Sequence, residues 1–513
     1  KRVVAVDPND PRAWFLLGRN TILMGDGSRA IRDYLVRALA LQTQLGNEKG
    51  KADALAAIAK AYQRSNDYPR ALENSTAALQ IQKSLGDERG VASTLRDRAL
   101  IHQAMGKLAD AQADLKAARE LYEKIGDRAG VADAWNASGV IEEARGAYGK
   151  AFEAYQSALK LRRTLGDERL LAQSYDNIGY IYYLQGEYDN GLVYWQQALD
   201  LRRKIREKSG VVLSLQNMGF LALAQGRWDE ATRFFAEALE TSRETGQKDA
   251  AVISLGNLGL VHQLRGRFSA ALSSLDEALA LARAMPFEAA LVEFTLKKGA
   301  IALELGRAED AGALLADAGK RVGGTGNSEQ QADLEVLRGG LCLFRGDREG
   351  ARKAFDRALP LARESGSRVS SLRARLARAA AFPGGSGEGP APLAAVLADA
   401  ESLGHTVLTL EASEALARND LARRRFAEAA QTLRKAVSLA ERAGWNEGLY
   451  RLYALSGKAL EGSGDRAAAS ELFGKAAAEI AKLQENVPPT MRASFDSLPA
   501  VREVLARKDS AAR

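Results

Sequence analysis

The chain has 513 residues, of which 27% are charged and 46% hydrophobic, with one cysteine, three histidines and a formal net charge of +7. A single compact core rarely exceeds about 300 residues, so several domains or an extended array are expected. Collagen-like, disulfide-framed and disordered chains are excluded, because Cys342 has no partner and alanine and leucine are abundant. The charge balance is mild and interspersed along the chain, so it implies neither a nucleic-acid nor a membrane partner.

The first residues carry no targeting signal. The segment Lys1 to Asp10 lacks the apolar core and cleavage site of a signal peptide, and no run of about 18 apolar residues occurs in the chain. We therefore expect a cytoplasmic protein without direct membrane insertion. Because the chain starts without methionine, we also expect it to be processed or excerpted, with an address or a domain upstream.

A 40-residue repeat organises the chain. Glycine recurs at this spacing, and so do alanine and a mixed series of small residues. Members of the three series are Gly106, Gly146, Gly186, Gly226, Gly266, Gly306 and Gly346; Ala38, Ala78, Ala118, Ala158, Ala198 and Ala238; and Ala59, Ala99, Gly139, Gly179, Gly219, Gly259, Gly299 and Gly339. A period of this length is typical of solenoids, in which each repeat is one supersecondary unit.

Each repeat reads as two amphipathic helices. Apolar residues fall three or four apart from Ala172 to Leu184 and again from Tyr188 to Leu201. A glycine such as Gly186 separates the two helices, since glycine tolerates the left-handed conformation that ends a helix. Glycine followed by Asp or Asn links one repeat to the next, and the polar side chain can cap the next helix. These links are Gly46-Asn47, Gly86-Asp87, Gly126-Asp127 and Gly166-Asp167.

Small and large residues divide the packing between the two helices. Helices that cross closely need alanine or glycine at the crossing, because larger side chains push the axes apart. Large apolar residues begin the second helices and recur seven positions later on the same face, which predicts a core. They are Tyr148, Tyr188, Trp228 and Phe268, followed by Tyr155, Trp195, Phe235 and Leu275.

The repeats resemble tetratricopeptide repeats. In the repeat that begins near Leu171, Tyr175, Ile178-Gly179 and Tyr182 match the W-x2-L-G-x2-Y pattern, and Gly191, Trp195 and Ala198 follow it. The next repeat matches through Leu215, Met218, Gly219, Ala231, Phe235 and Ala238. The Gly-Asp links look like the longer variety found in Leu-Gly-Asn repeat proteins and kinesin light chains. The resemblance implies an all-α fold, an α-solenoid with a right-handed superhelix of about twelve stacked helix-turn-helix units and a C-terminal capping helix.

Interruptions in the register give the expected boundaries. Residues 1–10 read as the end of a truncated helix with a linker, and 11–366 as a regular array of about nine repeats. Residues 367–406 form a degenerate repeat with a Gly/Pro-rich insertion at 382–390, and 407–486 form two further repeats. Residues 487–513 hold the capping helix and a tail. A lesser turn is expected at Val322 to Gly326.

The search for catalytic chemistry finds no convergent set. His102, His262 and His405 lie in three different repeats, where packing explains them better than catalysis. One cysteine and three dispersed histidines cannot form the usual zinc sites, so neither a metal nor another cofactor is expected. Gly323-Gly324-Thr325-Gly326 lacks the preceding strand and the Lys-Ser/Thr of a phosphate-binding loop. We therefore expect a protein that is not an enzyme.

The expected functional surface is the concave face lined by the first helices. Asparagine recurs there at one position, and its amide can both donate to and accept from a peptide backbone; the alternative is a hydrogen bond between neighbouring helices. Apolar residues beside it suit a bound helix or extended peptide, or else form inter-repeat core. The candidates are Asn177, Asn217, Asn257, Tyr180, Tyr183, Phe220, Leu260 and Leu264. Charged residues in the flanking repeats, among them Lys60, Arg96, Asp97 and Glu304, could orient a ligand.

Arginines between Arg352 and Arg378 make the second half locally basic. A basic stripe would mark a nucleic acid or an acidic peptide as the ligand. These arginines are distributed around their helices, and no aromatic residues interleave for base stacking. The pattern favours a solvated face.

Two functions remain open at this level. The first, which the sequence favours, is a scaffold or adaptor that binds a protein or peptide segment in its groove, without nucleic acid and without chemistry of its own. The alternative is a regulatory arm of a larger signalling protein, because the tail from Val487 to Phe495 resembles the ends of repeat arrays on bacterial kinases, ATPases or cyclases. A receptor for a small signalling peptide is a further variant of the second function.

Overall fold

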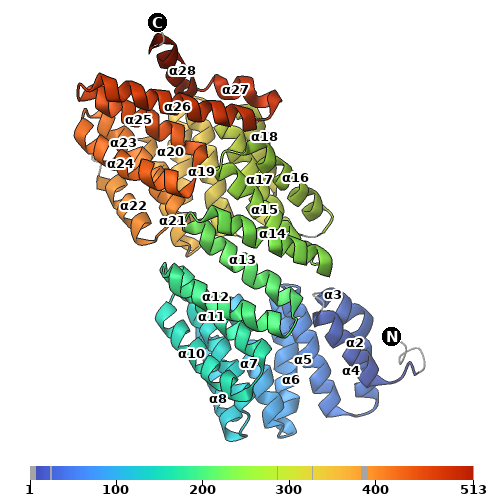
Figure 1. Cartoon of the computed structure of the whole chain (residues 1–513). Helices are drawn as coiled ribbons and strands as arrows, with labels where there is room; N and C mark the ends of the chain where they lie inside the picture. The colour runs from blue at the N-terminus through green and yellow to red at the C-terminus, as the bar shows by residue number, and fades with distance from the viewer. Residues whose placement is uncertain (1–6, 24–25, 286, 326, 383–390, 512–513) are drawn as a thin grey trace. The chain divides into compact units, whose positions relative to one another are not determined.

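The computed structural model describes residues 7–23, 26–285, 287–325, 327–382 and 391–511. These residues form consecutive antiparallel helix pairs (Figure 1). The truncated helix predicted at the start of the chain includes residues 1–6, and the predicted Gly/Pro-rich insertion includes residues 383–390. Both stretches lie outside the described residues. The chain separates into two compact units, unit 1 (Lys1–Ile181) and unit 2 (Tyr182–Arg513).

Twelve first helices occur in the part of the chain that the structure describes. They are α2 (Pro11–Leu23), α5 (Glu48–Arg64), α7 (Glu88–Ala104), α9 (Arg128–Ala144), α11 (Glu168–Gln185), α13 (Lys208–Ala224), α15 (Lys248–Leu264), α17 (Glu288–Glu304), α19 (Ser328–Phe344), α21 (Arg368–Ala381), α23 (Thr406–Ala422) and α25 (Asn446–Gly462).

The second helices pack antiparallel to the first. In the first pair this partner is broken into α3 (Gly27–Ala30), a π-helical stretch η1 (Ile31–Leu35) and α4 (Val36–Gln44). The others are α6 (Tyr68–Ser84), α8 (Leu108–Lys124), α10 (Tyr148–Leu165), α12 (Tyr188–Lys204), α14 (Trp228–Thr245), α16 (Phe268–Arg283), α18 (Ala308–Thr325), α20 (Arg348–Glu364), α22 (Ala391–Ser402), α24 (Phe426–Ala443) and α26 (Arg466–Asn486). Three short elements follow: η2 (Pro489–Met491), α27 (Arg492–Asp496) and α28 (Pro499–Ala511).

The links between repeats have the predicted geometry. Gly86 has a φ of 67°, the left-handed conformation that ends α6. Asp87 then caps α7, because its side chain accepts a hydrogen bond from the backbone N–H of Gly90. Asn47 caps α5 and Asp127 caps α9 in the same way. The predicted turn at Val322 is wrong, because α18 continues through Thr325.

The predicted core is confirmed. Tyr148, Tyr188, Trp228 and Phe268 are the first residues of α10, α12, α14 and α16. The residues seven positions later, Tyr155, Trp195, Phe235 and Leu275, are buried completely or nearly so. The glycine on each first helix makes room for such a side chain: a Cβ on Gly219 would lie 2.6 Å from Cε1 of Phe235. The glycines of the small-residue series therefore mark positions where a large side chain enters between the helices, an aromatic ring at Gly139, Gly219 and Gly339 and a leucine at Gly259 and Gly299.

Unit 2 winds far enough for its last repeats to pack on its earlier ones. Asn446 at the start of α25 donates from Nδ2 to the carbonyl of Arg265 at 3.3 Å, although 181 residues separate them. Ser269 on α16 donates from Oγ to the carbonyl of Asn486 at 2.9 Å. Side chains of α13–α16 and of α25–α28 share one hydrophobic core. The repeats of unit 2 thus touch partners other than their sequence neighbours.

Candidate partner-binding faces

The first helices line the inner face of each unit. Successive first helices contact one another, as α7 and α9 do in unit 1 and α17 and α19 do in unit 2. Successive second helices make at most weak contacts. Because the inner side of a curved stack is shorter than the outer side, the closer set of helices forms the concave side. We call these surfaces the inner face of unit 1 and the inner face of unit 2.

The inner face of unit 1 carries a ladder of polar side chains. Lys60 on α5 lies 3.7 Å from Asp97 on α7, and Arg96 on α7 pairs with Asp133 on α9 at 3.1 Å. Burial would lower the pKa of Arg96, but Asp97, Tyr122 and Asp133 outweigh it and raise this pKa above its usual value. The flanking charges that the sequence singled out therefore bind one another and stiffen the face.

Asn177 stands at the α11 end of this ladder. Its Nδ2 donates to Oδ1 of Asn136 on α9 at 2.9 Å, and Oδ1 of Asn136 also accepts from Arg162 at 3.3 Å. A bond between neighbouring helices is the alternative that the sequence left open for this residue. Tyr180, almost one turn further along α11, has 40% of its surface exposed. Tyr180 is therefore the candidate of unit 1 that a ligand can reach.

The inner face of unit 2 holds the other six candidates. Tyr183 stacks on Tyr188 and Trp195, with ring centroids 5.6 Å and 6.1 Å apart. Phe220 meets the edge of Phe235 at 5.5 Å. Burial raises the pKa of Tyr183 above its usual value, which agrees with a ring enclosed on most sides. These two rings extend the core toward the inner face and stay half-buried.

The remaining candidates of unit 2 divide by burial. Asn257 is 3% exposed and donates from Nδ2 to the carbonyl of Ile253 on its own helix at 2.8 Å. Leu264 is 5% exposed, so in this conformation neither residue can touch a ligand. Leu260 is half-buried. Asn217 is also half-buried, and among the described residues its side-chain amide has no hydrogen-bond partner.

A group of charged and polar side chains lies where α25 packs against α15 and α17. We call it the acidic seam: Gln263, Glu304, Glu414, Glu447 and Arg451. Nε2 of Gln263 donates to Glu304 at 3.3 Å and to Glu447 at 3.4 Å. Arg451 lies 3.5 Å from Glu304 and 3.1 Å from Glu414. The seam joins four first helices through three carboxylates and one guanidinium.

The seam disfavours a second negative charge beside Glu304. Burial raises the pKa of Glu447 well above its usual value, and repulsion by Glu304 with a hydrogen bond from protonated Glu447 raises it further. Glu411 on α23 keeps contact with solvent. Even so, burial by the surrounding protein raises the pKa of its carboxyl group to about 6. Sequence reasoning missed the role of α23 and α25, because nothing local shows that these helices return to α15.

The pKa of Glu447 predicts how stability depends on pH. The folded state holds a proton on Glu447 that the unfolded chain releases above its ordinary pKa of about 4.5. Stability therefore falls as pH rises from there to the raised pKa. We expect Glu447→Gln to be more stable than the wild type at pH 8 and equally stable near pH 4, in thermal melts followed by circular dichroism. Glu401→Gln, an exposed change on α22, is the control; a constant difference between Glu447→Gln and wild type across pH would contradict the raised pKa.

The histidines occupy separate structural positions. His102 is buried, with Nε2 3.7 Å from Asp114, and His262 lies on α15. His405 caps α23, where its Nδ1 accepts from the N–H of Leu408 at 3.3 Å, and burial lowers its pKa to about 4. Within the described residues, no three His, Cys, Asp or Glu side chains are placed to hold a metal ion. None of the described helices is long and apolar enough to cross a membrane.

Comparisons with known proteins find a family model that matches part of the chain and solved structures with a similar fold. The family model described as Tetratricopeptide repeat matches residues 90–164, 170–244 and 211–284. No curated protein sequence matches the chain. The solved apo form of RapI is 12% identical and covers 70% of this chain and 99% of its own, with a TM-score of 0.50.

Two further solved structures are similar over most of their length. The apo form of the quorum sensor NprR from B. thuringiensis is 14% identical and covers 69% of this chain and 98% of its own, with a TM-score of 0.49. Yeast Tom70 is 16% identical and covers 98% of this chain and 96% of its own, with a TM-score of 0.37. At such low identities, structural similarity speaks for the fold and not for the ligand.

Proposed function

We propose that this chain, which contains tetratricopeptide repeats, is a non-catalytic scaffold that binds a peptide or helical segment of a partner protein on its inner faces. A stack of helix pairs creates an extended concave surface without needing a catalytic centre. Groove recognition of this kind combines apolar anchors with groups that bond to the peptide backbone. The chain carries both kinds of group on its first helices.

The observation that carries the proposal is Asn217. An amide that is half-buried and unbonded loses part of its hydration without gaining a protein partner, which costs free energy. Phe220 lies almost one turn further along α13 and is half-buried. A peptide on this face could bond to the Asn217 amide and place an apolar side chain on the Phe220 ring. Binding would then replace water at the Asn217 amide by the peptide backbone.

Tyr180 supports the proposal independently in unit 1. An exposed tyrosine offers a large apolar ring with a polar end at little entropic cost, and tyrosine is enriched at the energetic centres of interfaces. The ladder from Lys60 to Asn177 holds the helices beside it in place. Asn257 and Leu264 are left out of the proposed surface because they are buried.

We expect Asn217→Ala and Tyr180→Ala each to weaken peptide binding by roughly tenfold, the range that truncation of a central contact residue produces. The probes are peptides selected on the full chain from a random peptide library, with affinity measured by fluorescence anisotropy. Neither substitution removes a buried contact, so helix content and melting temperature should stay close to wild type.

Two exposed residues of α12, a second helix, serve as controls. Val193 is 54% exposed, and Asn190 bonds only to Glu187 in its own helix turn. Val193→Ala and Asn190→Ala should leave the affinity unchanged. If the selected peptides bind the Asn217 and Tyr180 variants as well as wild type, or if the α12 variants lose binding instead, the inner faces are not the binding surface.

A further inference from the structure

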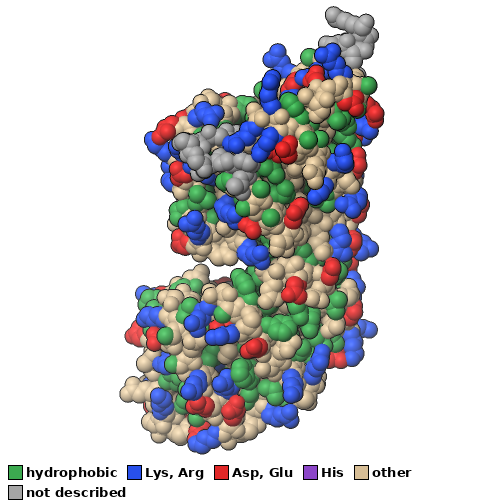
Figure 2. Space-filling view, turned by 90° about the vertical axis from the view of Figure 1, so that its left-hand side faces the viewer, with side chains coloured by type: hydrophobic (Ala, Val, Ile, Leu, Met, Phe, Trp, Pro, Cys, Tyr) green, Lys and Arg blue, Asp and Glu red, His purple; other side chains and the backbone are tan. Residues whose placement is uncertain are grey.

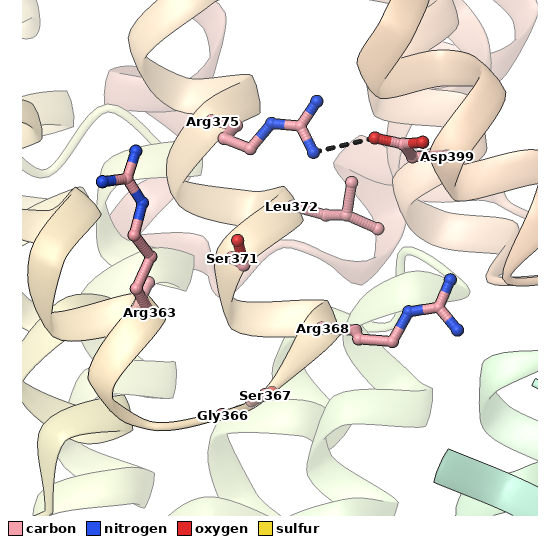
Figure 3. Close-up of a pocket in the computed structure, with 9 residues that line it drawn as sticks. Arg363, Gly366, Ser367, Arg368, Ser371, Leu372, Arg375 and Asp399 are labelled. Carbon is pink, nitrogen blue, oxygen red and sulfur yellow. Dashed lines mark hydrogen bonds and ion pairs between the residues drawn. The ribbon is translucent and has the colours of Figure 1, made fainter. Parts of the chain in front are cut away.

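A pocket of about 380 Å³ opens in unit 2 at the link between α20 and α21. None of the residues that line it is a candidate residue of the inner faces. Its lining comes from the end of α20, the first half of α21 and one residue of α22 (Figure 3). Arg363, Arg368 and Arg375 are its charged bases, Asp399 is its acid, and Ser371 stands between them. We call it the arginine pocket.

Most arginines of α20 and α21 already pair with a carboxylate or an aromatic ring of the chain. Arg357 pairs with Glu335, Arg373 with Asp333 and Arg375 with Asp399, at 2.7, 2.7 and 2.8 Å. Three others lie over the ring of Phe382: Arg348, Arg352 and Arg378. Arg363 and Arg368 remain: among the described residues neither has a carboxylate partner or lies over an aromatic ring, and the charge of Arg368 acts on the Tyr188 hydroxyl, where it opposes the rise in that group's pKa. Both line the arginine pocket.

The arginine pocket therefore carries uncompensated positive charge. Asp399 balances the charge of Arg375, so the guanidinium groups of Arg363 and Arg368 account for two unmatched charges. The amides at the start of α21 add partial positive charge, since a helix begins with unpaired N–H groups. Leu372 and Ala362 also line the pocket, but they are only 4% and 1% exposed and offer a ligand almost no surface. The pocket therefore attracts anions through its arginines and the helix amides.

The directions of the side chains indicate the shape of the anion. Arg363 and Arg368 extend on opposite sides of Ser371 and Leu372 (Figure 3). One compact anion cannot contact both in this arrangement, whereas a chain with spaced carboxylates can meet each guanidinium with two parallel hydrogen bonds.

We propose that the arginine pocket binds an acidic polypeptide segment, with glutamate or aspartate side chains paired to Arg363 and Arg368. A nucleic acid fits less well, because no aromatic side chain lines the pocket for base stacking and two free guanidinium groups neutralise few phosphates. The sequence pattern favoured a solvated face for the arginines between Arg352 and Arg378. In the structure most of these arginines have partners within the chain, and Arg363 and Arg368 are the two that we propose pair with the ligand.

The test uses the full chain with fluorescein-labelled hexaglutamate as probe and anisotropy as readout. We expect saturable binding that weakens as salt is added, because the contacts are ionic and exposed. Arg363→Gln and Arg368→Gln should each weaken it by roughly tenfold, as expected for loss of a charge-assisted bond. Arg423→Gln removes an exposed arginine of unit 2 outside the pocket and should change nothing. Labelled hexaglutamine should not bind.

Three results would overturn the proposal. Absence of saturable hexaglutamate binding at low salt is the first. The second is an equal loss of affinity in Arg423→Gln, which would show attraction by net charge alone. The third is tighter binding of a single-stranded hexanucleotide that depends on Arg363 and Arg368, which would assign the pocket to nucleic acid. Unchanged melting of the two pocket variants confirms that a loss of binding is local.

Discussion

Replacing Gly219 by leucine is expected to lower the free energy of unfolding of unit 2 by about 3 kcal/mol, the upper end of the usual cost of overpacking. A Cβ at this position would lie 2.6 Å from Cε1 and 2.8 Å from Cζ of Phe235. Phe235 is fully buried and meets Phe220 at its edge, so the ring cannot turn away without disturbing a second ring. The helices α13 and α14 must therefore separate.

Urea unfolding followed by circular dichroism measures this loss. Gly474→Ala is the matched control, because Gly474 also lies within a helix of unit 2 and has nothing within 4 Å of an added Cβ. That control should gain a few tenths of a kcal/mol to about 1 kcal/mol, since alanine favours a helix over glycine. If Gly219→Leu were as stable as wild type, the packing of α13 on α14 would differ from the one described.

The second large effect is expected at Arg451. Arg451→Met keeps an apolar stem about as long as the methylene chain of arginine but removes the guanidinium group from the acidic seam. Glu304 and the protonated Glu447 then lie in the seam without this cation, and Glu414 keeps, among the described residues, only Arg418, 2.6 Å away. Breaking a buried ion pair on one side typically costs about 3–5 kcal/mol, because the remaining charge stays desolvated. Arg451 is 20% exposed at its side chain, so the lower end of that range applies.

The pH dependence identifies the cause of this loss. Burial raises the pKa of Glu414 and Arg451 lowers it, so in the variant Glu414 takes up a proton more readily, and part of the lost stability should return as pH falls toward 4. The exposed Arg434→Met on α24 should show neither the loss nor the recovery. A loss of stability in Arg451→Met that is the same at pH 4 and pH 8 would mean that Arg451 acts by packing alone.

Charged side chains are scattered over the visible face of the protein, with acidic and basic groups alternating (Figure 2). Such surface pairs contribute little each. The acidic seam and the arginine pocket differ from them in opposite ways. In the seam, carboxylates outnumber the cation and share a proton; in the pocket, two cations lack carboxylates. At both places the positive and negative charges do not match, and residues outside the repeat pattern determine the local charge.

Much of the fold follows from the sequence because it depends on short-range rules. Gly86 and Asp87 end one helix and cap the next through contacts three residues apart, so the residue types alone predict the link. The core position of Phe235 follows from its periodic place opposite Gly219. The break of the second helix of the first pair into α3, η1 and α4 was not predictable, because Ile31 to Leu35 continue a helical pattern without glycine or proline.

The candidate site was predictable only in part. The sequence placed Asn177, Asn217 and Asn257 at one position of the repeat, but their surroundings differ: one bonds to Asn136, one to its own helix, and one to no described residue. Neighbouring repeats set these differences through residues such as Asn136, which the repeat pattern does not include. The contact between Gln263 and Glu447 spans 184 residues and depends on how far unit 2 winds.

The return of α25 and α26 to α15 and α16 changes how unit 2 can come apart. In an open stack, the terminal repeat touches one neighbour and can peel away first, so opening spreads inward from the ends. In unit 2 the bonds from Asn446 to Arg265 and from Ser269 to Asn486 close the stack on itself. The last repeat of unit 2 is therefore held at two places, by its neighbour in sequence and by the middle helices α15 and α16. It can separate from the stack only after its contacts with these middle helices break.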